Sequence, residues 1–443
     1  MMTSEPVLAV GVIDGVPEVR GVLHGSFRTE SGDSVTGAFT ARASAEDLRL
    51  AVEPVGTLRA RGELKLSPLG EARAQILNVT IGVQFHWERT EAQTFQGAVR
   101  FRRRPDATLT LINDIALEQY LTSVISSEMS AESSLEFLRA HAITSRSWLV
   151  AMLDRRDDPL AQGKAGRIES PELIVRWYDR QDHDAFDVCA DDHCQRYQGL
   201  TKIVSPVAAE AVASTRGVFL VHGGRVCDAR FFKACGGRTE EFQNAWEDRP
   251  LAYLRSVTDG PGELGPVSEE TSARRWIESS PEAFCNTRDA RLLKKILPSF
   301  DQETTDFFRW KLDYGRTELE EIIRQRSQID FGDLLDLVPV QRGPSGRITR
   351  LRIVGRKRTV TVGKELEIRK WLSRSHLYSS AFIVERVGPA GPPPERFVLR
   401  GAGWGHGVGL CQIGAAVMAE RGYTAESIVK HYFRTAELTK LYP

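Results

Sequence analysis

Two histidines and two cysteines stand close together near the middle of the chain: His183, Cys189, His193 and Cys194. Thiolate sulfur and imidazole nitrogen are the ligands that zinc takes in structural sites, where four of them surround the ion. The adjacent pair His193 and Cys194 would need an irregular loop for both side chains to face one ion. The spacing therefore predicts a zinc site, and the alternative is a solvated loop rich in Asp and His.

A single glutamate, Glu128, stands between the apolar residues Ile125 and Met129, just ahead of a segment that we predict to be a helix. In an apolar cleft, a carboxyl group holds its proton more firmly and could act as a general acid. The alternative is an acidic residue that complements the positive end of the helix dipole, which is common. The local sequence leaves both interpretations open.

Glycines occupy every second position from Gly401 to Gly409. In an extended strand, one face would then be bare backbone, and Trp404 and His406 would share the opposite face. A bare face allows close approach of another backbone or of a ligand such as a sugar, and an aromatic face suits stacking on a pyranose ring. We predict that this strand forms one wall of a ligand groove, with Gln412 available for hydrogen bonds. The alternative is a tightly packed core strand.

Cys235 is followed by two glycines, and a thiol in such a segment could be a nucleophile with His406 as its base. No third member of a catalytic set and no oxyanion site is visible in the sequence. The alternative is a small buried apolar residue, which is the common state of a single cysteine.

Composition excludes several classes of protein. The chain has 443 residues, of which 41% are hydrophobic and 27% charged, as in a folded globular protein. Lys plus Arg and Asp plus Glu both number 59, so no overall charge points to nucleic acid or to an anionic membrane.

Walker A, H-E-x-x-H, C-x-x-C and G-x-S-x-G motifs are absent. Six cysteines are too few for a disulfide scaffold, and they leave the redox compartment open.

Membrane and targeting signals are also missing from the sequence. No apolar run approaches the length of about 18 residues that a transmembrane helix needs, so we expect no transmembrane segment. The first residues show no basic region ahead of an apolar stretch, and we identify no signal peptide. The expectation is a cytoplasmic protein or one whose leader is absent from this sequence.

The elements that must position these residues can be read from periodicity. Residues 1–112 alternate apolar and polar positions and predict a series of strands. A helix is expected from Ser133, which has the spacing of a capping box with Glu136. Residues 153–203 are charged and irregular and read as a long loop or a small insertion. Residues 205–216 read as a helix, and the pair Gly223–Gly224 as the turn of a hairpin.

The second half of the chain is mixed. Residues 250–345 are polar with helical spacing, and strands return in ITRLRIVG and KRTVTVG. The chain should end in two short helices that are separated at Gly422.

Four ordered segments resemble the family of the sporulation protein SpoIID and the amidase enhancer LytB. The first, L-E-x-Y-L through S-E-M to the following helix, runs from Leu117 to Trp148 and contains Glu128. The second, D-x-x-x-Q-x-Y-x-G, runs from Asp191 to Gly199. The third is C-G-G-x-T at Cys235–Thr239, with Trp246 after it, and the fourth is G-x-GWGHGVGxxQxGA at Gly401–Ala415.

The sequence departs from the family pattern in two places. Ser130 replaces the proline expected after the Glu-Met pair, and Ser145 to Trp148 replaces an A-R-T-Y run. Neither change removes the glutamate. The resemblance covers roughly residues 92–255 and 345–443.

The resemblance implies a lytic transglycosylase that acts on peptidoglycan glycan strands lacking stem peptides. Glu128 would be the catalytic residue: as an acid it would protonate the glycosidic oxygen, and as a base it would take the proton of the muramic 6-hydroxyl. The implied substrate-binding residues are Ser127, Arg146, Lys233, Thr239, Trp404, His406 and Gln412.

Some members of the family bind a structural zinc through His and Cys, which would be His183, Cys189, His193 and Cys194 here. The chemistry itself would need no cofactor.

Arg146 follows the expected helix start by 13 residues, which is roughly 20 Å along a helix. We therefore expect it to be structural or to line the cleft, and not to pair with Glu128.

A different class of function is a non-catalytic amidase enhancer of the LytB kind, with a cell-wall amidase as partner and a role in sporulation, division or wall turnover. A third is a thiol peptidase that uses Cys235 and His406. The family works outside the cytoplasmic membrane, in the periplasm or on the cell-wall side. No nucleic acid partner is expected.

The expected fold is α+β, with a β-rich SpoIID-like core and a few helices around a glycan-binding cleft. The domains expected are a β-rich region at 1–90, a SpoIID-like region in two parts at 91–255 and 346–443, and a helical insertion at 256–345.

Overall fold

The computed structural model describes residues 4–82, 88–156, 166–178, 183–191, 193–298, 301–302, 304–389, 391 and 393–443. The chain divides into two compact units. Unit 1 consists of Met1–Leu138, Arg180–Val218 and Lys440–Pro443, and unit 2 consists of Arg139–Asp179 and Phe219–Thr439.

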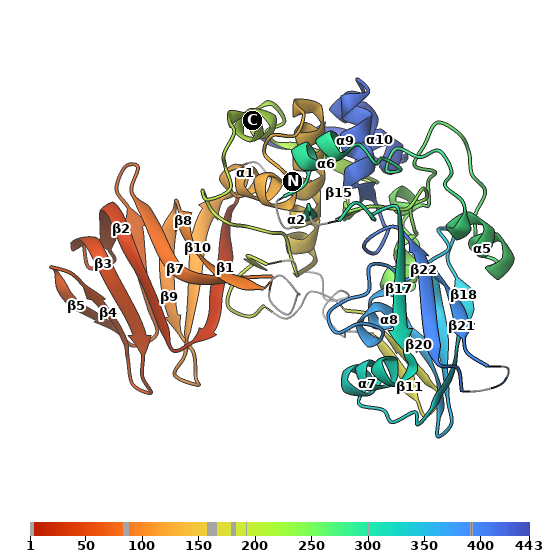
Figure 1. Cartoon of the computed structure of the whole chain (residues 1–443). Coiled ribbons are helices and arrows are strands. Elements are labelled where there is room, and N and C mark those ends of the chain that lie inside the picture. The colour runs from red at the N-terminus through yellow and green to blue at the C-terminus, as the bar shows by residue number, and fades with distance from the viewer. Residues whose placement is uncertain are drawn as a thin grey trace. The chain divides into compact units, whose positions relative to one another are not determined.

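Unit 1 is built on one 11-stranded sheet with the order β13-β1-β10-β9-β6-β2-β3-β4-β5, in which β7 pairs with β2 and β8 (Figure 1). Its strands are β1 (Val7–Val16), β2 (Glu18–Thr29), β3 (Ser34–Ala43), β4 (Leu48–Val52), β5 (Gly56–Ala60), β6 (Glu63–Pro68), β7 (Arg73–Ile81), β8 (Arg89–Phe95), β9 (Ala98–Arg103), β10 (Leu109–Ala116) and β13 (Val188–Cys189).

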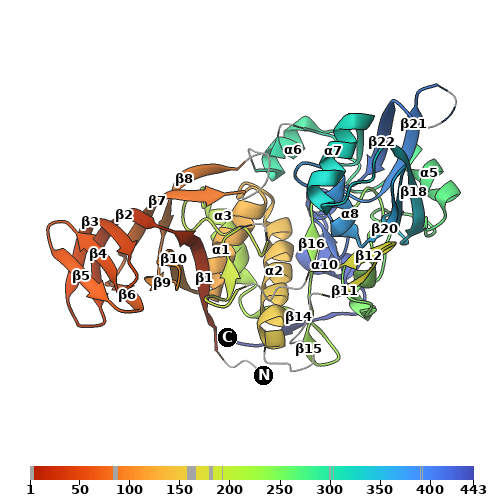
Figure 2. The same ribbon diagram turned by 90° about the horizontal axis from the view of Figure 1, so that it is seen from below.

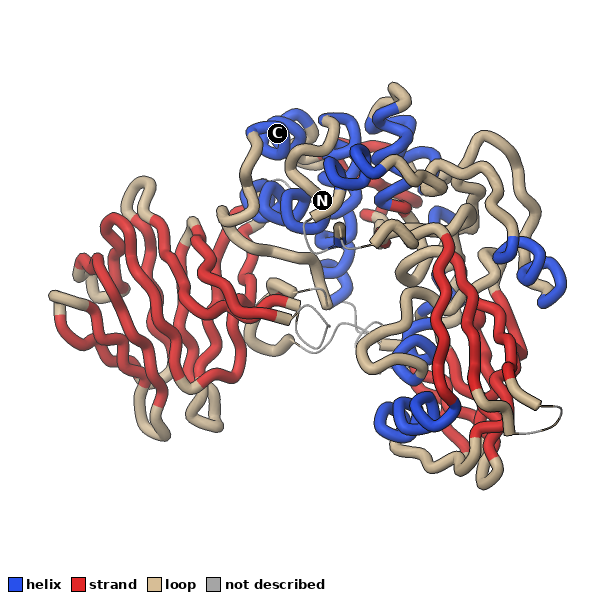
Figure 3. The backbone as a smooth tube through the Cα atoms, in the orientation of Figure 1, coloured by secondary structure: helices blue, strands red, loops and turns tan. Residues whose placement is uncertain are grey.

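The strands form because apolar residues alternate with polar ones, so that one face of the sheet is buried. In β4, Leu48, Leu50 and Val52 are buried and the two residues between them are exposed. Figure 3 shows this part of the chain as consecutive strands joined by short loops, which confirms the predicted β-rich start. The sheet continues through β10, past residue 90 and into the region that the family motifs cover.

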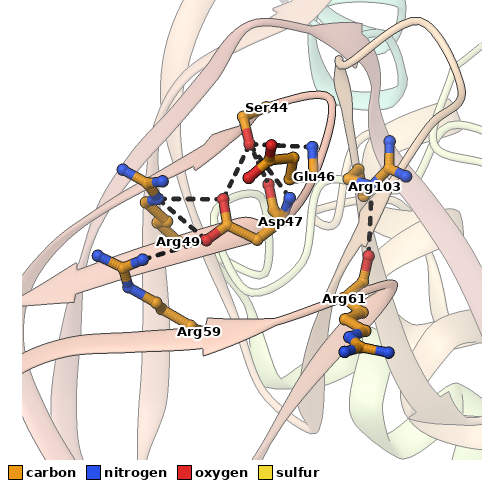
Figure 4. A network of polar contacts seen from close by, with 7 residues as sticks. All are labelled: Ser44, Glu46, Asp47, Arg49, Arg59, Arg61 and Arg103. Carbon is orange, nitrogen blue, oxygen red and sulfur yellow. Dashed lines mark hydrogen bonds and ion pairs between the residues drawn. The ribbon is translucent and has the colours of Figure 1, made fainter.

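Polar contacts hold the exposed turn between β3 and β4 (Figure 4). Asp47 accepts hydrogen bonds from Ser44 Oγ at 2.8 Å and from Arg49 Nε at 3.0 Å. These two hydrogen bonds, with Ser44 first, lower the pKa of Asp47. A second contact joins other elements, because Arg103 Nε donates to the carbonyl of Arg61 at 3.2 Å. This end of the sheet is thus ordered by side chains that remain in water.

Two helices complete unit 1: α1 (Leu117–Glu128), which follows β10 directly, and α3 (Pro206–Ser214), which packs against α1. Ser205 caps α3 by accepting the N–H of Val207, and Pro206 occupies the first turn, where its missing N–H costs nothing. This confirms the predicted helix at 205–216.

Helix α2 (Leu135–Arg156) is the long helix labelled in Figure 2, and most of it belongs to unit 2. The predicted capping box at its start is wrong, because the helix begins at Leu135 and Ser133 Oγ meets no hydrogen-bond partner among the described residues.

Unit 2 contains several smaller sheets. Their orders are β11-β12-β20-β19-β18, β17-β22-β21, β16-β23 and β15-β14-β24. The strands are β11 (Arg167–Ser170), β12 (Leu173–Arg176), β14 (Val218–His222), β15 (Arg225–Val226), β16 (Phe231–Phe232), β17 (Arg309–Gly315), β18 (Leu334–Arg342), β19 (Ile348–Gly355), β20 (Thr359–Gly363), β21 (Phe382–Val387), β22 (Arg396–Ala402), β23 (Leu410–Cys411) and β24 (Glu437–Lys440).

The other helices of unit 2 are short. They are α4 (Phe242–Ala245), the 3-10 helix η1 (Ala252–Leu254), α5 (Glu270–Glu278), α6 (Ala290–Ile296), α7 (Arg316–Ser327), α8 (Glu365–Trp371), α9 (Gln412–Glu420) and α10 (Ala425–Tyr432). No described helix is both long enough and apolar enough to cross a membrane.

Several local predictions are confirmed in unit 2. Gly223 and Gly224 form the turn between β14 and β15 with φ of 57° and 76°, the left-handed values that a type I′ turn requires. The strands ITRLRIVG and KRTVTVG are β19 and β20. The two predicted helices are α9 and α10, which lie on either side of Gly422, but the strand β24 follows them.

Two predictions of organisation need correction. Residues 256–345 contain α5, α6 and α7, but also β17 and β18, which pair with β22 and β19. The segment therefore shares sheets with the C-terminal region and is not helical throughout. Residues 153–203 were expected as a long loop or a small insertion, but α2 continues to Arg156, and β11 and β12 form a hairpin. Residues 157–165, 179–182 and 192 lie outside the described ones. The α+β class is confirmed.

Candidate functional site

Glu128 is the last residue of α1 and lies in unit 1. Only 9% of its surface is exposed, and Ile125 and Met129 beside it are fully buried. Its Oε1 accepts a hydrogen bond from the backbone N–H of Arg196 at 2.9 Å. The sequence therefore folds so that a carboxyl group lies at the end of a buried helix, with one oxygen held by a loop from 68 residues further along the chain.

That loop, residues 190–199, lies along α1 and contains the second family motif. Its Tyr197 ring stacks on Tyr120 with centroids 5.1 Å apart. The N–H of Gln198 donates to Ser123 Oγ at 3.1 Å. Gly199 has φ of 57°, and a Cβ there would lie 2.2 Å from the carbonyl oxygen of Thr94. The motif thus serves to fix the loop against α1, which explains its Tyr and Gly.

Two residues of the motif form further hydrogen bonds with other segments of unit 1. Asp191 Oδ1 accepts the N–H of Gly82 at 3.1 Å, and the Tyr197 hydroxyl donates to Asn113 Oδ1 at 2.5 Å. Gln195 is fully buried.

The side chains of His183, Cys189, His193 and Cys194 converge in unit 1. Their ligand atoms all lie within 4.8 Å of one another. Cys194 Sγ is 3.4 Å from His183 Nε2 and 3.5 Å from His193 Nδ1. In a tetrahedral zinc site with these ligands, neighbouring donor atoms are about 3.3 to 3.8 Å apart. The four residues fit such a site.

Backbone structure explains how this cluster forms. Cys189 lies in β13, which pairs in parallel with β1 at Val10 and Gly11, so the edge of the large sheet fixes one ligand. The hydrogen bond with Cys194, followed by burial, raises the pKa of Cys189 to about 11. The Cys189 thiol therefore holds its proton more firmly than a free thiol.

Tyr120 lies near both the His/Cys cluster and Glu128. The sequence analysis included this residue only as part of the first family motif. Burial raises the pKa of Tyr120 well above its usual value, and Cys194, Cys189 and Glu128 raise it further, so all three groups lie near the ring. Among the described residues, the Tyr120 hydroxyl has no hydrogen-bond partner.

In unit 2, the third and fourth family motifs lie against each other. Strands β16 and β23 pair in parallel. Ala234 and Trp404 exchange backbone hydrogen bonds of 3.1 and 2.7 Å, and the N–H of Glu240 donates to the carbonyl of Gly407 at 2.7 Å. Residues 401–411 therefore run beside residues 230–240 over their whole length.

The predicted extended strand from Gly401 to Gly409 is wrong. Strand β22 ends at Ala402, and the glycines that follow it at positions 403, 405, 407 and 409 have φ of 74°, 97°, 84° and 87°. L-residues rarely adopt such angles, so every second residue must be glycine for this loop to form. The spacing thus encodes a loop with alternating left-handed residues, and we call residues 403–409 the glycine loop.

Arg347 supports the glycine loop from within and was missed by the sequence analysis. Its side chain is fully buried, and it donates to the carbonyls of Gly405 and Cys235 at 3.1 and 3.3 Å. A Cβ on Gly407 would lie 2.4 Å from the guanidinium carbon. Arg347 belongs to none of the four motifs, so no local signal identified it.

Trp404 and His406 are both half-buried. The Trp404 ring lies 4.2 Å from Tyr378 and 4.9 Å from Phe307, measured between centroids. His406 Nδ1 accepts the N–H of Val408 at 3.1 Å. Burial, followed by the charge of Arg230, lowers the pKa of His406 well below its usual value, so this ring is neutral.

Ser127 and Thr239, two predicted substrate-binding residues, are buried and engaged locally. Ser127 Oγ donates to the carbonyl of Ser123 at 2.8 Å, within α1. Thr239 Oγ1 accepts the N–H of Val257 at 2.8 Å. Each hydroxyl group thus forms a hydrogen bond with the backbone of its own unit.

The remaining three predicted residues also have partners. Lys233 Nζ pairs with Asp301 Oδ2 at 2.7 Å. Gln412 is buried, and its Nε2 is 3.0 Å from His141 Nε2. Arg146 is fully buried, with its guanidinium carbon 6.0 Å from the centre of the Phe219 ring. Arg146 is thus a buried, packed residue of unit 2.

Cys235 does not have the surroundings of a nucleophile. Its Sγ is 3.4 Å from Cys285 Sγ, and burial raises the pKa of the thiol well above its usual range. A reactive cysteine is accessible and has a lowered pKa. The thiol-peptidase interpretation is therefore unsupported.

The predicted residues form two groups. Glu128, Ser127 and the His/Cys cluster belong to unit 1, while Trp404, His406 and the others belong to unit 2. The other members of the second group are Arg146, Lys233, Thr239 and Gln412.

Two family models match different parts of the chain. Residues 105–222 match the family model described as Stage II sporulation protein, SpoIID. Residues 240–409 match a domain of unknown function, DUF8618, which includes the whole segment 256–345 that the motifs left unexplained.

Similar proteins carry related names. Stage II sporulation protein D of Bacillus amyloliquefaciens is 24% identical over 329 residues, which is 74% of this chain and 76% of that protein. Its namesake in Bacillus subtilis (strain 168) is 24% identical over 331 residues, with the same coverage. An amidase enhancer of Bacillus subtilis (strain 168) is 22% identical over 338 residues, which is 72% of this chain and 40% of that protein.

Residues 105–222, which include Glu128 and the His/Cys cluster, are thus similar to the SpoIID family model. The resemblance to the SpoIID/LytB family, predicted from four motifs, is confirmed.

Proposed function

We propose that this chain is a cell-wall protein that acts outside the cytoplasmic membrane and cleaves peptidoglycan glycan strands as a lytic transglycosylase. The observation that carries the proposal is Glu128, a buried carboxyl group whose Oε1 is held by the N–H of Arg196. The names of the relatives support a sporulation or cell-wall role. The preferred substrate is glycan that has lost its stem peptides.

One carboxyl group is enough for this reaction. The protonated Glu128 donates its proton to the oxygen between N-acetylmuramic acid and N-acetylglucosamine as the bond from muramic C1 to that oxygen breaks. The resulting carboxylate then takes the proton of the muramic 6-hydroxyl, whose oxygen bonds to C1 and gives a 1,6-anhydro end. No water is consumed, so the second carboxylate of ordinary glycosidases is not needed.

We also propose that the His/Cys cluster holds a structural zinc. His183, Cys189, His193 and Cys194 supply four protein ligands and leave no open position for substrate or water. When bound, zinc would supply a rigid link between loop segments. Cys194 is only two residues from Arg196, so a fixed Cys194 helps to hold the N–H that orients Glu128.

In unit 2, we propose that the half-exposed rings of Trp404 and His406 bind sugar. Aromatic rings stack on the apolar face of a pyranose, and Trp404 is already held in place by Tyr378 and Phe307.

Substitution of Glu128 by Gln tests the enzymatic proposal. Gln retains the acceptor oxygen for Arg196 but cannot transfer a proton, so we expect cleavage to fall by at least ~10²-fold with little change in the melting temperature. The assay measures 1,6-anhydromuramic ends released from peptide-stripped glycan and from intact sacculi. The control is Glu132→Gln, which makes the same chemical change at an exposed position four residues away and should retain full activity.

Two results would contradict the proposal. Products with reducing ends would show hydrolysis, and the single-carboxylate mechanism would then be wrong. Full activity of Glu128→Gln would show that Glu128 transfers no proton in the reaction.

The second candidate function is a non-catalytic enhancer of a cell-wall amidase, which one relative's name favours. A wild-type chain that cleaves no glycan but stimulates a purified cell-wall amidase on sacculi would establish it.

A further inference from the structure

Unit 2 contains a second group of metal-ligand side chains, which no motif identified: Cys235, Asp259, Cys285 and Cys411. Their ligand atoms all lie within 4.8 Å of one another. All four residues are completely buried, with at most 1% of the surface exposed. They are spread over 177 positions of the chain, so only the tertiary fold brings them together.

The sulfur atoms face one another and receive backbone donors. Cys235 Sγ and Cys285 Sγ are 3.4 Å apart. The N–H of Gly237 donates to Cys235 Sγ at 3.3 Å, and the N–H of Cys235 donates to Cys411 Sγ at 3.3 Å. N–H donors directed at sulfur stabilise thiolates, and metal ligands are commonly held by such outer contacts.

Asp259 is a buried carboxylate without a cationic partner. Oδ2 accepts the N–H of Cys285 at 2.9 Å, and Oδ1 accepts the hydroxyl of Tyr432 at 2.6 Å. Within the described part of the chain, no Lys, Arg or His side chain forms an ion pair with it. A buried carboxylate is expected to be paired with a cation or to coordinate a metal, and here three thiols are its neighbours.

A positive charge is available beside the group. Arg309 donates to the carbonyl of Gly236, the residue after Cys235, at 2.9 Å. Three thiolates and one carboxylate exceed the charge of a divalent ion, and a neighbouring guanidinium lessens this excess.

We propose that Cys235, Asp259, Cys285 and Cys411 bind a second zinc ion, in a structural site of three thiolates and one carboxylate. Thiolate ligands favour zinc over magnesium and calcium, and four protein ligands leave no open position. This site is separate from the His/Cys cluster, which lies in unit 1, and it does not depend on the proposed enzymatic activity.

The elements that the ion would join define its role. Cys411 ends β23 directly after the glycine loop, and Cys235 follows β16, the partner strand of β23. Asp259 and Cys285 belong to the 256–345 segment. The ion would therefore tie the glycine loop and its neighbour to that segment, as a disulfide does in other proteins.

A disulfide between Cys235 and Cys285 is the competing state. Their sulfurs are 3.4 Å apart, whereas a disulfide requires 2.03 to 2.05 Å. A disulfide would remove two of the four ligands, so the two states exclude each other.

The test measures zinc per chain, by elemental mass spectrometry, in full-length protein purified without chelator. We expect Cys285→Ser to contain about one zinc ion fewer than the wild type. Cys227→Ser is the matched control, because Cys227 is buried in the same unit but lies outside both groups, and it should retain the wild-type zinc content. Cys194→Ser should lose the ion of the His/Cys cluster and keep the other.

A second measurement does not depend on how Cys285→Ser folds. Cys194→Ser leaves the proposed site intact, so its cobalt(II)-loaded form should show the intense visible bands of tetrahedral cobalt and the near-ultraviolet bands of sulfur ligands. These bands should disappear in the double variant that adds Cys411→Ser.

The proposal is overturned if Cys194→Ser binds neither zinc nor cobalt. It is also overturned if unreduced peptide mapping of the isolated protein shows Cys235 disulfide-bonded to Cys285. Cleavage of glycan is not a readout, so failure of the enzymatic proposal would leave this result unaffected.

Discussion

Glu128 occupies a position that a helix by itself disfavours. As the last residue of α1, it lies at the negative end of the helix dipole, where carboxylates destabilise the helix. The N–H of Arg196, which comes from another segment, compensates by donating to Oε1 of this carboxyl group. The structure therefore gives no support to the interpretation of Glu128 as a dipole-complementing residue, because that role requires a helix start.

At the residue scale, substitution of Cys194 tests whether the His/Cys cluster helps to orient the carboxyl group of Glu128. We expect Cys194→Ser to lose the zinc of this cluster and to reduce glycan cleavage at least roughly 10-fold, because the loop that carries the N–H of Arg196 loses its link. Zinc content and cleavage are measured on the same preparation. Normal cleavage by the zinc-free variant would mean that Tyr197 and Gln198 hold the loop without the metal.

At the element scale, a glycine can be required for two reasons: a left-handed backbone conformation and the close packing of a neighbouring side chain. Two glycines of this chain allow these reasons to be tested separately. Gly407 has φ of 84°, and a Cβ there would lie 2.4 Å from the Arg347 guanidinium carbon. Gly422, between α9 and α10, has φ of 88°, and its Cβ would meet nothing within 4 Å. The first position has both a backbone and a packing requirement, and the second has only the backbone requirement.

We therefore expect Gly422→Ala to lower the free energy of unfolding by roughly 1–2 kcal/mol, which is the cost of a left-handed L-residue. Gly407→Ala should cost clearly more, because Arg347 is fully buried and would have to move. Denaturant unfolding of both variants measures the difference. Equal losses would show that Arg347 moves aside without cost.

At the scale of the whole molecule, buried histidines predict acid sensitivity. His141 is completely buried, and burial, followed by the charge of Lys233, lowers its pKa from 6.5 to about 3. His406 is shifted in the same direction. Between pH 6.5 and 3, the unfolded chain takes up protons that the folded chain does not. Stability is therefore lost as the pH falls through this range, by up to about 1.4 kcal/mol per pH unit for each such histidine.

The measurement is the melting temperature between about pH 7.5 and 5, where most carboxylates stay ionised. We expect His141→Gln to show a shallower fall than the wild type, because one titrating group is removed. The control His24→Gln removes an exposed histidine of unit 1 and should keep the wild-type slope. An unchanged slope in His141→Gln would show that this residue is protonated in the folded protein.

The amino-acid sequence by itself determined those features whose residues are close along the chain. The His/Cys cluster spans twelve positions, and short-range spacing was enough to predict that four ligands meet. Gly223–Gly224 and Ser205–Pro206 likewise gave a turn and a helix start, because backbone angles and capping are local properties. The family motifs identified Glu128 as the candidate acid.

Tertiary structure alone decided what depends on distant segments. The alternating glycines were compatible with an extended strand, and only the packing of residues 401–411 against 230–240 and Arg347 selects left-handed angles. The same holds for the second ligand group, because Cys235, Asp259, Cys285 and Cys411 become neighbours only when distant strands pair. Local spacing fixes local geometry, whereas the meeting of distant side chains follows from how the whole core packs.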